Sequence, residues 1–202
     1  MSNYAHPENL VNIQWVADHL NDSQVRLVEI FWGVSPHFGK PAYDSQHIPG
    51  AVAWDFEKDL QDPTRRDVVD RPGLEALLSR SGITSKMTIV LYSGLNNLLA
   101  TYAFWLLKIY GHANIRLLDG DRQRWLDENR PTTNEAPSVT PTSYQAQEPN
   151  WSLRANREEV LQSIGKSKLV LLDARSPEMF RGLDKAGAQR GGHIPGAINL
   201  PA

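Results

Sequence analysis

The chain has 202 residues, a hydrophobic content of 41%, a formal net charge of −2 and no cysteine. Acidic and basic residues are interspersed, which disfavours nucleic-acid binding, and no stretch reaches the ~20 apolar residues needed to cross a bilayer. The first residues are too polar for a secretory signal, so we expect a cytoplasmic protein, and without cysteine the chain has no disulfide, thiolate metal site or thiol nucleophile of its own.

Short apolar runs alternate with helical patterns along the first 130 residues. The runs rich in β-branched residues predict strands, and the periodic apolar positions between them predict helices. The expected strands cover residues 25–30, 51–54, 88–92 and 115–118, and the expected helices cover residues 14–20, 72–81, 96–110 and 121–128. Because each return to a parallel strand needs a crossover long enough for a helix, this order predicts an α/β fold with a central, mostly parallel sheet flanked by helices.

The composition changes at residue 130. Residues 130–149 contain four prolines, clustered Ser and Thr, and little to bury, which predicts a linker. A helical pattern at 154–164 and a strand at 169–172 then follow, so the earlier order begins again. The expected organisation is a first domain over residues 1–130, a linker over 131–150, and the opening part of a second domain over 151–202.

The pentapeptide HIPGA occurs twice. It begins at His47 within QHIPGAVAW and at His193 within GHIPGAINL, 146 positions later. A repeat at this separation indicates a duplicated domain. Proline fixes φ and glycine admits positive φ, so each copy predicts a rigid bend into a strand. We expect both histidines to hold the bend through hydrogen bonds to the backbone or a carboxylate rather than to act in acid/base chemistry.

Taken in series, these motifs resemble those of the rhodanese family. The first copy has HIPGA, the strand TIVLY with the loop SGLNN, YGH at 110–112 and RLLDGDRQRW at 116–125, and the second has LVLLDARSPEMFRG at 169–182 and the repeated HIPGA. Their order is similar to that of tandem-domain thiosulfate or 3-mercaptopyruvate sulfurtransferases. The resemblance implies a rhodanese-like first domain of the non-catalytic type, followed by a second one that is truncated before its catalytic cysteine loop.

The resemblance also implies a reaction. In that family a cysteine thiolate takes sulfane sulfur from thiosulfate or mercaptopyruvate, holds it as a persulfide and passes it to cyanide or a thiol, with a small sulfur-containing anion as substrate and no cofactor. Because this chain encodes no cysteine, we expect it to be inactive alone. The alternative is a non-catalytic rhodanese module with a binding or regulatory role. The second segment is expected to dock on the first domain, to self-associate or to stay mobile.

The loop of the first copy consists of Ser93, Gly94, Leu95, Asn96 and Asn97. The resemblance places Ser93 where the nucleophile would stand, but a hydroxyl without a neighbouring base is a poor nucleophile, so no catalysis is expected there. The loop N–H groups are one candidate for an anion cradle. The other interpretation is an ordinary strand-to-helix connection in which Asn96 or Asn97 caps the helix, and the lack of Arg or Lys in the loop favours it.

Asp173, Arg175 and Glu178 follow the expected strand of the second copy. The resemblance places them at the rim of a substrate pocket, whereas an ordinary salt-bridged turn explains them equally well. Met179 stands where related enzymes often have an arginine that faces the substrate anion, which weakens the pocket interpretation. The six histidines show no i, i+3 or i, i+4 pairing of the kind that aims two imidazoles at one ion, so no metal is predicted.

Overall fold

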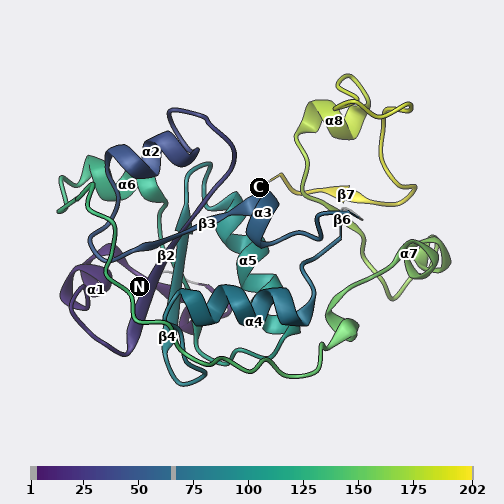
Figure 1. The fold of residues 1–202 in the computed structure, drawn as a ribbon. Coiled ribbons are helices and arrows are strands. Elements are labelled where there is room, and N and C mark those ends of the chain that lie inside the picture. Colours follow the sequence, from purple (N-terminus) through teal and green to yellow (C-terminus); the bar gives the residue numbers. More distant parts are fainter. Residues whose placement is uncertain (1–3, 65–66, 202) are drawn as a thin grey trace. The chain divides into compact units, whose positions relative to one another are not determined.

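The computed structural model describes residues 4–64 and 67–201, and the chain divides into two compact units. Unit 1 covers Met1–Asn150 and unit 2 covers Trp151–Ala202. Figure 1 shows unit 1 as a sheet with helices on both faces, and unit 2 as a smaller group of short helices and strands.

A parallel sheet of five strands forms the centre of unit 1. In spatial order the strands are β1 (Leu10–Val11), β5 (Ile115–Leu118), β4 (Thr88–Ser93), β2 (Val25–Phe31) and β3 (Val52–Asp55). Every neighbouring pair is parallel, and the register places Glu29 of β2 between Tyr92 of β4 and Ala53 of β3. The predicted α/β fold with a central parallel sheet is therefore confirmed.

The helices of unit 1 are α1 (Ile13–Asp18), α2 (Lys40–Ser45), α3 (Phe56–Asp59), α4 (Arg71–Arg80), α5 (Leu98–Ile109) and α6 (Arg122–Asp127), with a 3-10 turn at Pro7–Asn9. The four strands and four helices expected in this part of the chain agree with the structure to within two residues at each end. The short elements β1, α2 and α3 were not predicted. Asn96, which the sequence placed in the α5 helix, lies outside it.

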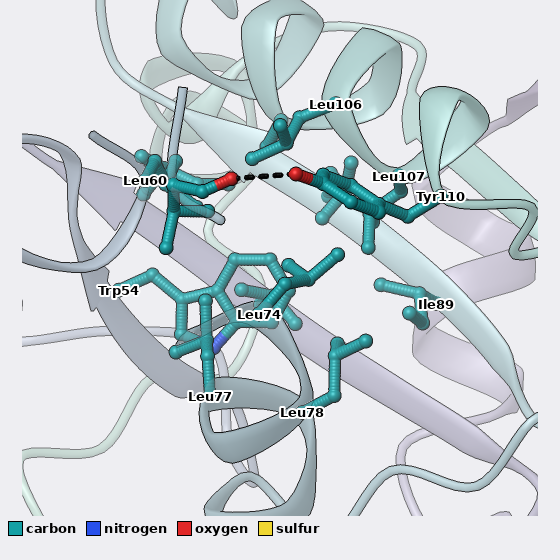
Figure 2. Packing of buried hydrophobic residues seen from close by; sticks show 14 of the residues in the cluster. Trp54, Leu60, Leu74, Leu77, Leu78, Ile89, Leu106, Leu107 and Tyr110 are labelled. Carbon is teal, nitrogen blue, oxygen red and sulfur yellow. Dashed lines mark hydrogen bonds between the residues drawn. The ribbon is translucent and has the colours of Figure 1, made fainter. Parts of the chain in front are cut away.

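Two hydrophobic clusters cover the two faces of the sheet. The larger one packs Val28 and Ile30 of β2 against leucines of α4 and α5, and the smaller one packs Leu27 of β2 with residues of α1 and α6. Figure 2 shows the larger cluster, where Trp54 and Leu77 lie among the labelled side chains. Burying a leucine of this kind contributes roughly 1.5–3 kcal/mol, so these two clusters stabilise the sheet from both faces.

The larger cluster is closed by hydrogen bonds as well as by apolar contact. The Tyr110 hydroxyl donates to the backbone carbonyl of Val69 over 2.8 Å, the bond dashed in Figure 2. The Trp54 indole N–H donates to the Ser81 hydroxyl over 2.9 Å. Buried polar atoms of large aromatic residues are thus satisfied inside the core.

The proline-rich segment after residue 130 packs on unit 1. All of its residues are described, and it has no helix or strand, as its composition predicts. The expectation that it has little to bury is wrong, because Tyr144 and Ala146 are buried in the larger cluster. Tyr144 forms a 2.8 Å hydrogen bond between its hydroxyl and Nδ1 of His112, and its backbone N–H donates to the Ser79 hydroxyl. Residues as far as Asn150 therefore belong to the compact body of unit 1.

Unit 2 contains a 3-10 turn at Trp151–Leu153, the helices α7 (Arg157–Ser163) and α8 (Pro177–Arg181), and the parallel strands β6 (Leu172–Asp173) and β7 (Ile198–Asn199). Asn156 starts α7 with a reciprocal capping box to Glu159. The strand predicted over residues 169–172 is wrong for residues 169–171, since only Leu172 and the following Asp173 pair with a neighbour. Among the described residues of unit 2, none is buried.

Candidate functional site

The loop between β4 and α5 lies at the carboxyl end of a central parallel strand. Ligand sites of open α/β sheets lie beyond these strand ends, so this loop is the first candidate site. Leu95, Asn96 and Asn97 have φ values of 55°, 52° and 62°, three successive left-handed residues. L-residues rarely adopt this conformation, and asparagine tolerates it better than leucine. Surrounding contacts must therefore hold the loop in shape.

Ser93 is fully buried. Its hydroxyl donates to the carbonyl of Gly94 over 2.9 Å and accepts from the Ala100 backbone N–H over 3.3 Å. A nucleophile has to reach its substrate, and this oxygen is instead occupied by the loop and by the first turn of α5. The hydrogen bonds of Ser93 therefore give it a structural role in the loop.

Asn97 is the residue that holds the loop. Its Oδ1 accepts from the Ser93 backbone N–H over 2.9 Å, and its Nδ2 donates to the carbonyls of Leu118 and Gly120 over 2.8 and 2.7 Å. The prediction that Asn96 or Asn97 caps α5 is met in position by Asn97, which is the N-cap residue, but its side chain makes no capping hydrogen bond. The Asn97 side chain instead ties the loop to the end of β5, the neighbouring strand.

Asp121 was missed by the sequence analysis. Its Oδ2 accepts a hydrogen bond from the backbone N–H of Asn96 over 3.2 Å, and its Oδ1 caps α6 through the N–H of Arg124. A carboxylate of the chain itself thus occupies one of the N–H groups of the candidate anion cradle. This contact favours the interpretation of the loop as a strand-to-helix connection.

Replacing Asn97 tests this account. We expect Asn97→Ala to lower the free energy of unfolding by about 3 kcal/mol, because it leaves buried backbone groups of Ser93 and Leu118 without a partner. Asn96→Ala is the matched control, since Asn96 has the same left-handed φ but is exposed. The Asn96→Ala variant should lose about 1 kcal/mol, which is the cost of placing an alanine in the left-handed conformation. Both variants share this cost. Urea unfolding followed by tryptophan fluorescence measures both, and equal losses would contradict the role of the Asn97 side chain.

A buried ion pair lies between β2 and α6. Arg122 donates from Nε to Oε1 of Glu29 over 3.1 Å, and the two side chains are only 9% and 2% exposed. The Nη2 of Arg122 also donates to the carbonyls of Ala42 and Gln46 over 2.9 and 2.6 Å, at the carboxyl end of α2. One guanidinium therefore joins the centre of the sheet, α2 and α6.

Burial raises the pKa of the Glu29 carboxyl to about 7, while the Tyr92 hydroxyl and the Arg122 guanidinium act to lower it. Among the described residues, Oε2 of Glu29 has no hydrogen-bond partner. Burial and the nearby Glu29 raise the pKa of Tyr92 well above its ordinary value. The Tyr92 hydroxyl accepts from the backbone N–H of Ile48 over 3.2 Å, which connects the cluster to the first HIPGA bend. The buried group of Glu29, Arg122 and Tyr92 thus contacts the first HIPGA bend through Tyr92 and contains, in Glu29, a carboxyl with a pKa of about 7.

The two HIPGA bends are anchored in the same way. The His47 ring stacks on Tyr43 with a centroid distance of 3.9 Å, and the His193 ring stacks on Phe180 at 3.7 Å. In both copies the histidine Nδ1 lies 2.8 Å from the backbone carbonyl of the same aromatic residue. The prediction that both histidines bond to the backbone is confirmed, and the sequence repeat is also a structural one.

Asp173, the last residue of β6, and the following Arg175 and Glu178 do not form one cluster. Arg175 binds both carboxylate oxygens of Asp173, which lowers the pKa of Asp173 to about 2, and its Nη2 also donates to the carbonyl of Gly192. Glu178 pairs with Arg181 instead. Asp173 and Arg175 line an open hollow of about 700 Å³ together with His193, whereas Glu178 is not among its lining residues. Asp173 and Arg175 thus form a salt-bridged turn that lines this hollow, and the role of the three residues at a substrate pocket stays a prediction.

Neither a metal site nor a membrane span stands out in the part of the chain that the structure describes. Over residues 4–64 and 67–201, no group of three or more His, Asp or Glu is arranged to hold an ion. In the same ranges no helix has both the length and the apolar character that a bilayer crossing requires.

Comparison with known proteins gives consistent matches. A family model described as "Rhodanese-like domain" matches residues 12–128 and, separately, residues 156–202. The chain is 45% identical over 201 residues to a putative thiosulfate sulfurtransferase of Saccharopolyspora erythraea, covering 96% of this chain and 69% of that protein. It is 42% identical over 208 residues to the sulfur carrier protein TtuD of Thermus thermophilus, covering 98% of this chain and 71% of that protein.

A solved structure matches the fold. The crystal structure of SseA from Escherichia coli, described as a 3-mercaptopyruvate sulfotransferase with the "Rhodanese" fold, superposes with a TM-score of 0.79 at 24% identity. The match covers 96% of this chain and 74% of that one. It shows a shared fold over nearly all of the 202 residues.

Proposed function

Because the chain belongs to the family of proteins with a rhodanese-like domain, we propose that it is a thiosulfate sulfurtransferase-like protein that transfers no sulfur by itself. The observation that carries this proposal is the buried, internally bonded Ser93 in the loop where the family places a nucleophile. Persulfide formation needs a thiolate, and the chain encodes no cysteine. The small sulfur-containing anion is then a substrate of the complete family enzyme rather than of this chain.

The proposal includes a domain organisation. Residues 1–130 form a first rhodanese-like domain of the non-catalytic type, residues 131–150 pack on that domain and lead on from it, and residues 151–202 belong to a second such domain. Two separate matches to one family model support this division. In each unit, one strand of a parallel pair directly follows a HIPGA bend: β3 of the pair β2–β3 and β7 of the pair β6–β7. The two bends are anchored in the same way, which supports the division as well.

Transfer from thiosulfate to cyanide tests the proposal directly. The reaction yields sulfite and thiocyanate, and we expect no thiocyanate above the buffer blank from the purified chain. Ser93→Cys should remain inactive and resist iodoacetamide in the folded state, because position 93 is fully buried. Val34→Cys, at an exposed position, is the labelling control. Turnover by the unmodified chain would refute the proposal, and rapid alkylation of Ser93→Cys would refute the argument from burial.

A binding role is the second candidate, and one observation favours it. Unit 2 exposes many large apolar side chains and, among its described residues, buries none. Exposed apolar patches of this kind mark interaction surfaces. We therefore also propose that the chain self-associates through unit 2.

A further inference from the structure

The short helix α2 lies against the buried pair of Glu29 and Arg122. It has six residues, of which Ala42 and Tyr43 are buried, and no side chain caps its beginning. Helices this short are marginal without tertiary contacts. Two of these contacts come from Nη2 of Arg122, which donates to the carbonyls of Ala42 and Gln46, and Figure 1 shows α2 beside α6, the helix that carries Arg122. Arg122 therefore links α2 to the carboxyl in the centre of the sheet.

The Glu29 carboxyl is poorly solvated in this closed arrangement. Glu29 is 2% exposed, its Oε1 accepts from Arg122, and its Oε2 has no hydrogen-bond partner among the described residues. An ionised carboxylate loses more hydration on burial than a neutral acid does, which agrees with the pKa of about 7 for Glu29. Contact with water would return this pKa to its ordinary value of 4.5. Ionisation therefore favours any conformation in which water reaches the carboxyl.

We propose that α2 is a proton-controlled cover, which is closed over Glu29 while the carboxyl is protonated and opens locally, without unfolding of the sheet, when the carboxyl ionises. The other groups around Glu29 do not replace it between pH 6 and 8. Burial raises the pKa of Tyr43 to about 12 and that of Tyr92 well above its ordinary value, so both stay neutral, and the Arg122 guanidinium stays charged. His47 stacks on Tyr43, so a glutamine variant is needed to separate any titration of His47 from that of Glu29.

Opening of α2 reaches the loop between β4 and α5. The turn before α2 is closed by a hydrogen bond from the N–H of Lys40 to the carbonyl of Gly33 over 2.9 Å. Phe38 of this turn packs against Gly94 so closely that a Cβ on Gly94 would lie 2.9 Å from the Phe38 Cβ. Displacement of α2 and its turn therefore removes a contact of that loop, and one buried proton is coupled to it. The proposal depends on neither sulfur transfer nor self-association.

Thiol labelling measures the opening, because the chain has no cysteine of its own. Ala42→Cys places a thiol at a buried position of α2, and Val34→Cys places one at an exposed position, which corrects for the pH dependence of the reaction itself. With excess iodoacetamide, the corrected labelling rate of Ala42→Cys should rise about tenfold from pH 6 to pH 8, the ratio set by a pKa of about 7 in the closed state and 4.5 in the open state. Adding Glu29→Gln should remove this rise.

Ala103→Cys is the matched control for unfolding of the whole unit. Ala103 is buried like Ala42 but lies within α5, so its thiol reacts only after the core opens. Its labelling should be at least about tenfold slower than that of Ala42→Cys at every pH. Equal rates for the two chains, a corrected Ala42→Cys rate that stays constant between pH 6 and 8, or a rise that persists with Glu29→Gln would each overturn the proposal.

Hydrogen exchange gives the same comparison without a buried thiol. The Gln46 backbone N–H donates to the carbonyl of Ala42 and exchanges when α2 opens. At each pH the intrinsic exchange rate is the same in the unmodified and Glu29→Gln chains, so it cancels in the ratio of their rates. This ratio should also rise about tenfold from pH 6 to pH 8. A constant ratio would overturn the proposal independently of the labelling result.

Discussion

Arg122→Met should lower the free energy of unfolding of unit 1 by about 3–5 kcal/mol at pH 8. At that pH the Glu29 carboxyl, with a pKa of about 7, is mainly ionised. Removing the guanidinium leaves this buried carboxyl without its partner and takes one donor from the Gln46 carbonyl, whereas the Ala42 carbonyl still accepts from Ser45 and Gln46. Urea unfolding followed by far-UV circular dichroism measures the loss.

Arg124→Met is the matched control on the same helix. Arg124 is 60% exposed and pairs with Glu128 one turn along α6 at 3.5 Å. Exposed pairs of this kind contribute little, so the loss should stay below about 0.5 kcal/mol. Arg122→Lys should lie between the two, because an ammonium cannot reach the carboxylate and two carbonyls at once. Similar losses for Arg122→Met and Arg124→Met would show that the buried pair is not what holds α2 and α6 to the sheet.

The sheet of unit 1 could be predicted because its strands are nearly continuous apolar runs. TIVLY at residues 88–92 is buried on both faces, and such a run is typical of an inner parallel strand. The helix α3 was missed because four residues are too few for a periodic pattern, and α2 was missed because its buried residues, Ala42 and Tyr43, are adjacent rather than three or four positions apart. The run at residues 169–172 has the same composition as a buried strand, but only Leu172 of it pairs, with β7 as its one neighbour in the described part of unit 2.

The contacts of the candidate site were less accessible to sequence reasoning. Ser93 and Asn97 were singled out as loop residues, but the bonds from Asn97 to the end of β5 depend on which strands are neighbours. Glu29 and Arg122 are 93 residues apart. One signal was available, because a glutamate within the apolar run VRLVEIF is expected to need a buried partner. The identity of that partner is fixed only by the fold.

Glu29→Gln should change how stability depends on pH. The pKa of Glu29 in the folded state is about 7, above its ordinary value of 4.5, so the folded protein holds this proton more tightly than the unfolded one. The stabilisation that the protonated carboxyl provides is fully present below pH 4.5 and is lost as the pH rises to about 7. A shift of this size corresponds to roughly 3 kcal/mol. Glutamine does not titrate, so the Glu29→Gln chain should gain about that much over the unmodified chain between pH 4.5 and 7.5.

Urea unfolding of both chains at several pH values measures the difference in their free energies of unfolding. The contributions of the other titrating groups are the same in both chains and cancel in this difference. Glu75→Gln is the control with the opposite sign. The Ala146 backbone N–H and Arg71 hold the pKa of Glu75 below its ordinary value, so its contribution is present above pH 4.5 and is lost as the pH falls. The two variants should therefore diverge from the unmodified chain in opposite directions and in different pH windows. A Glu29→Gln difference that is flat across pH 4.5–7.5 would mean that the buried carboxyl stays ionised throughout, with Arg122 outweighing desolvation.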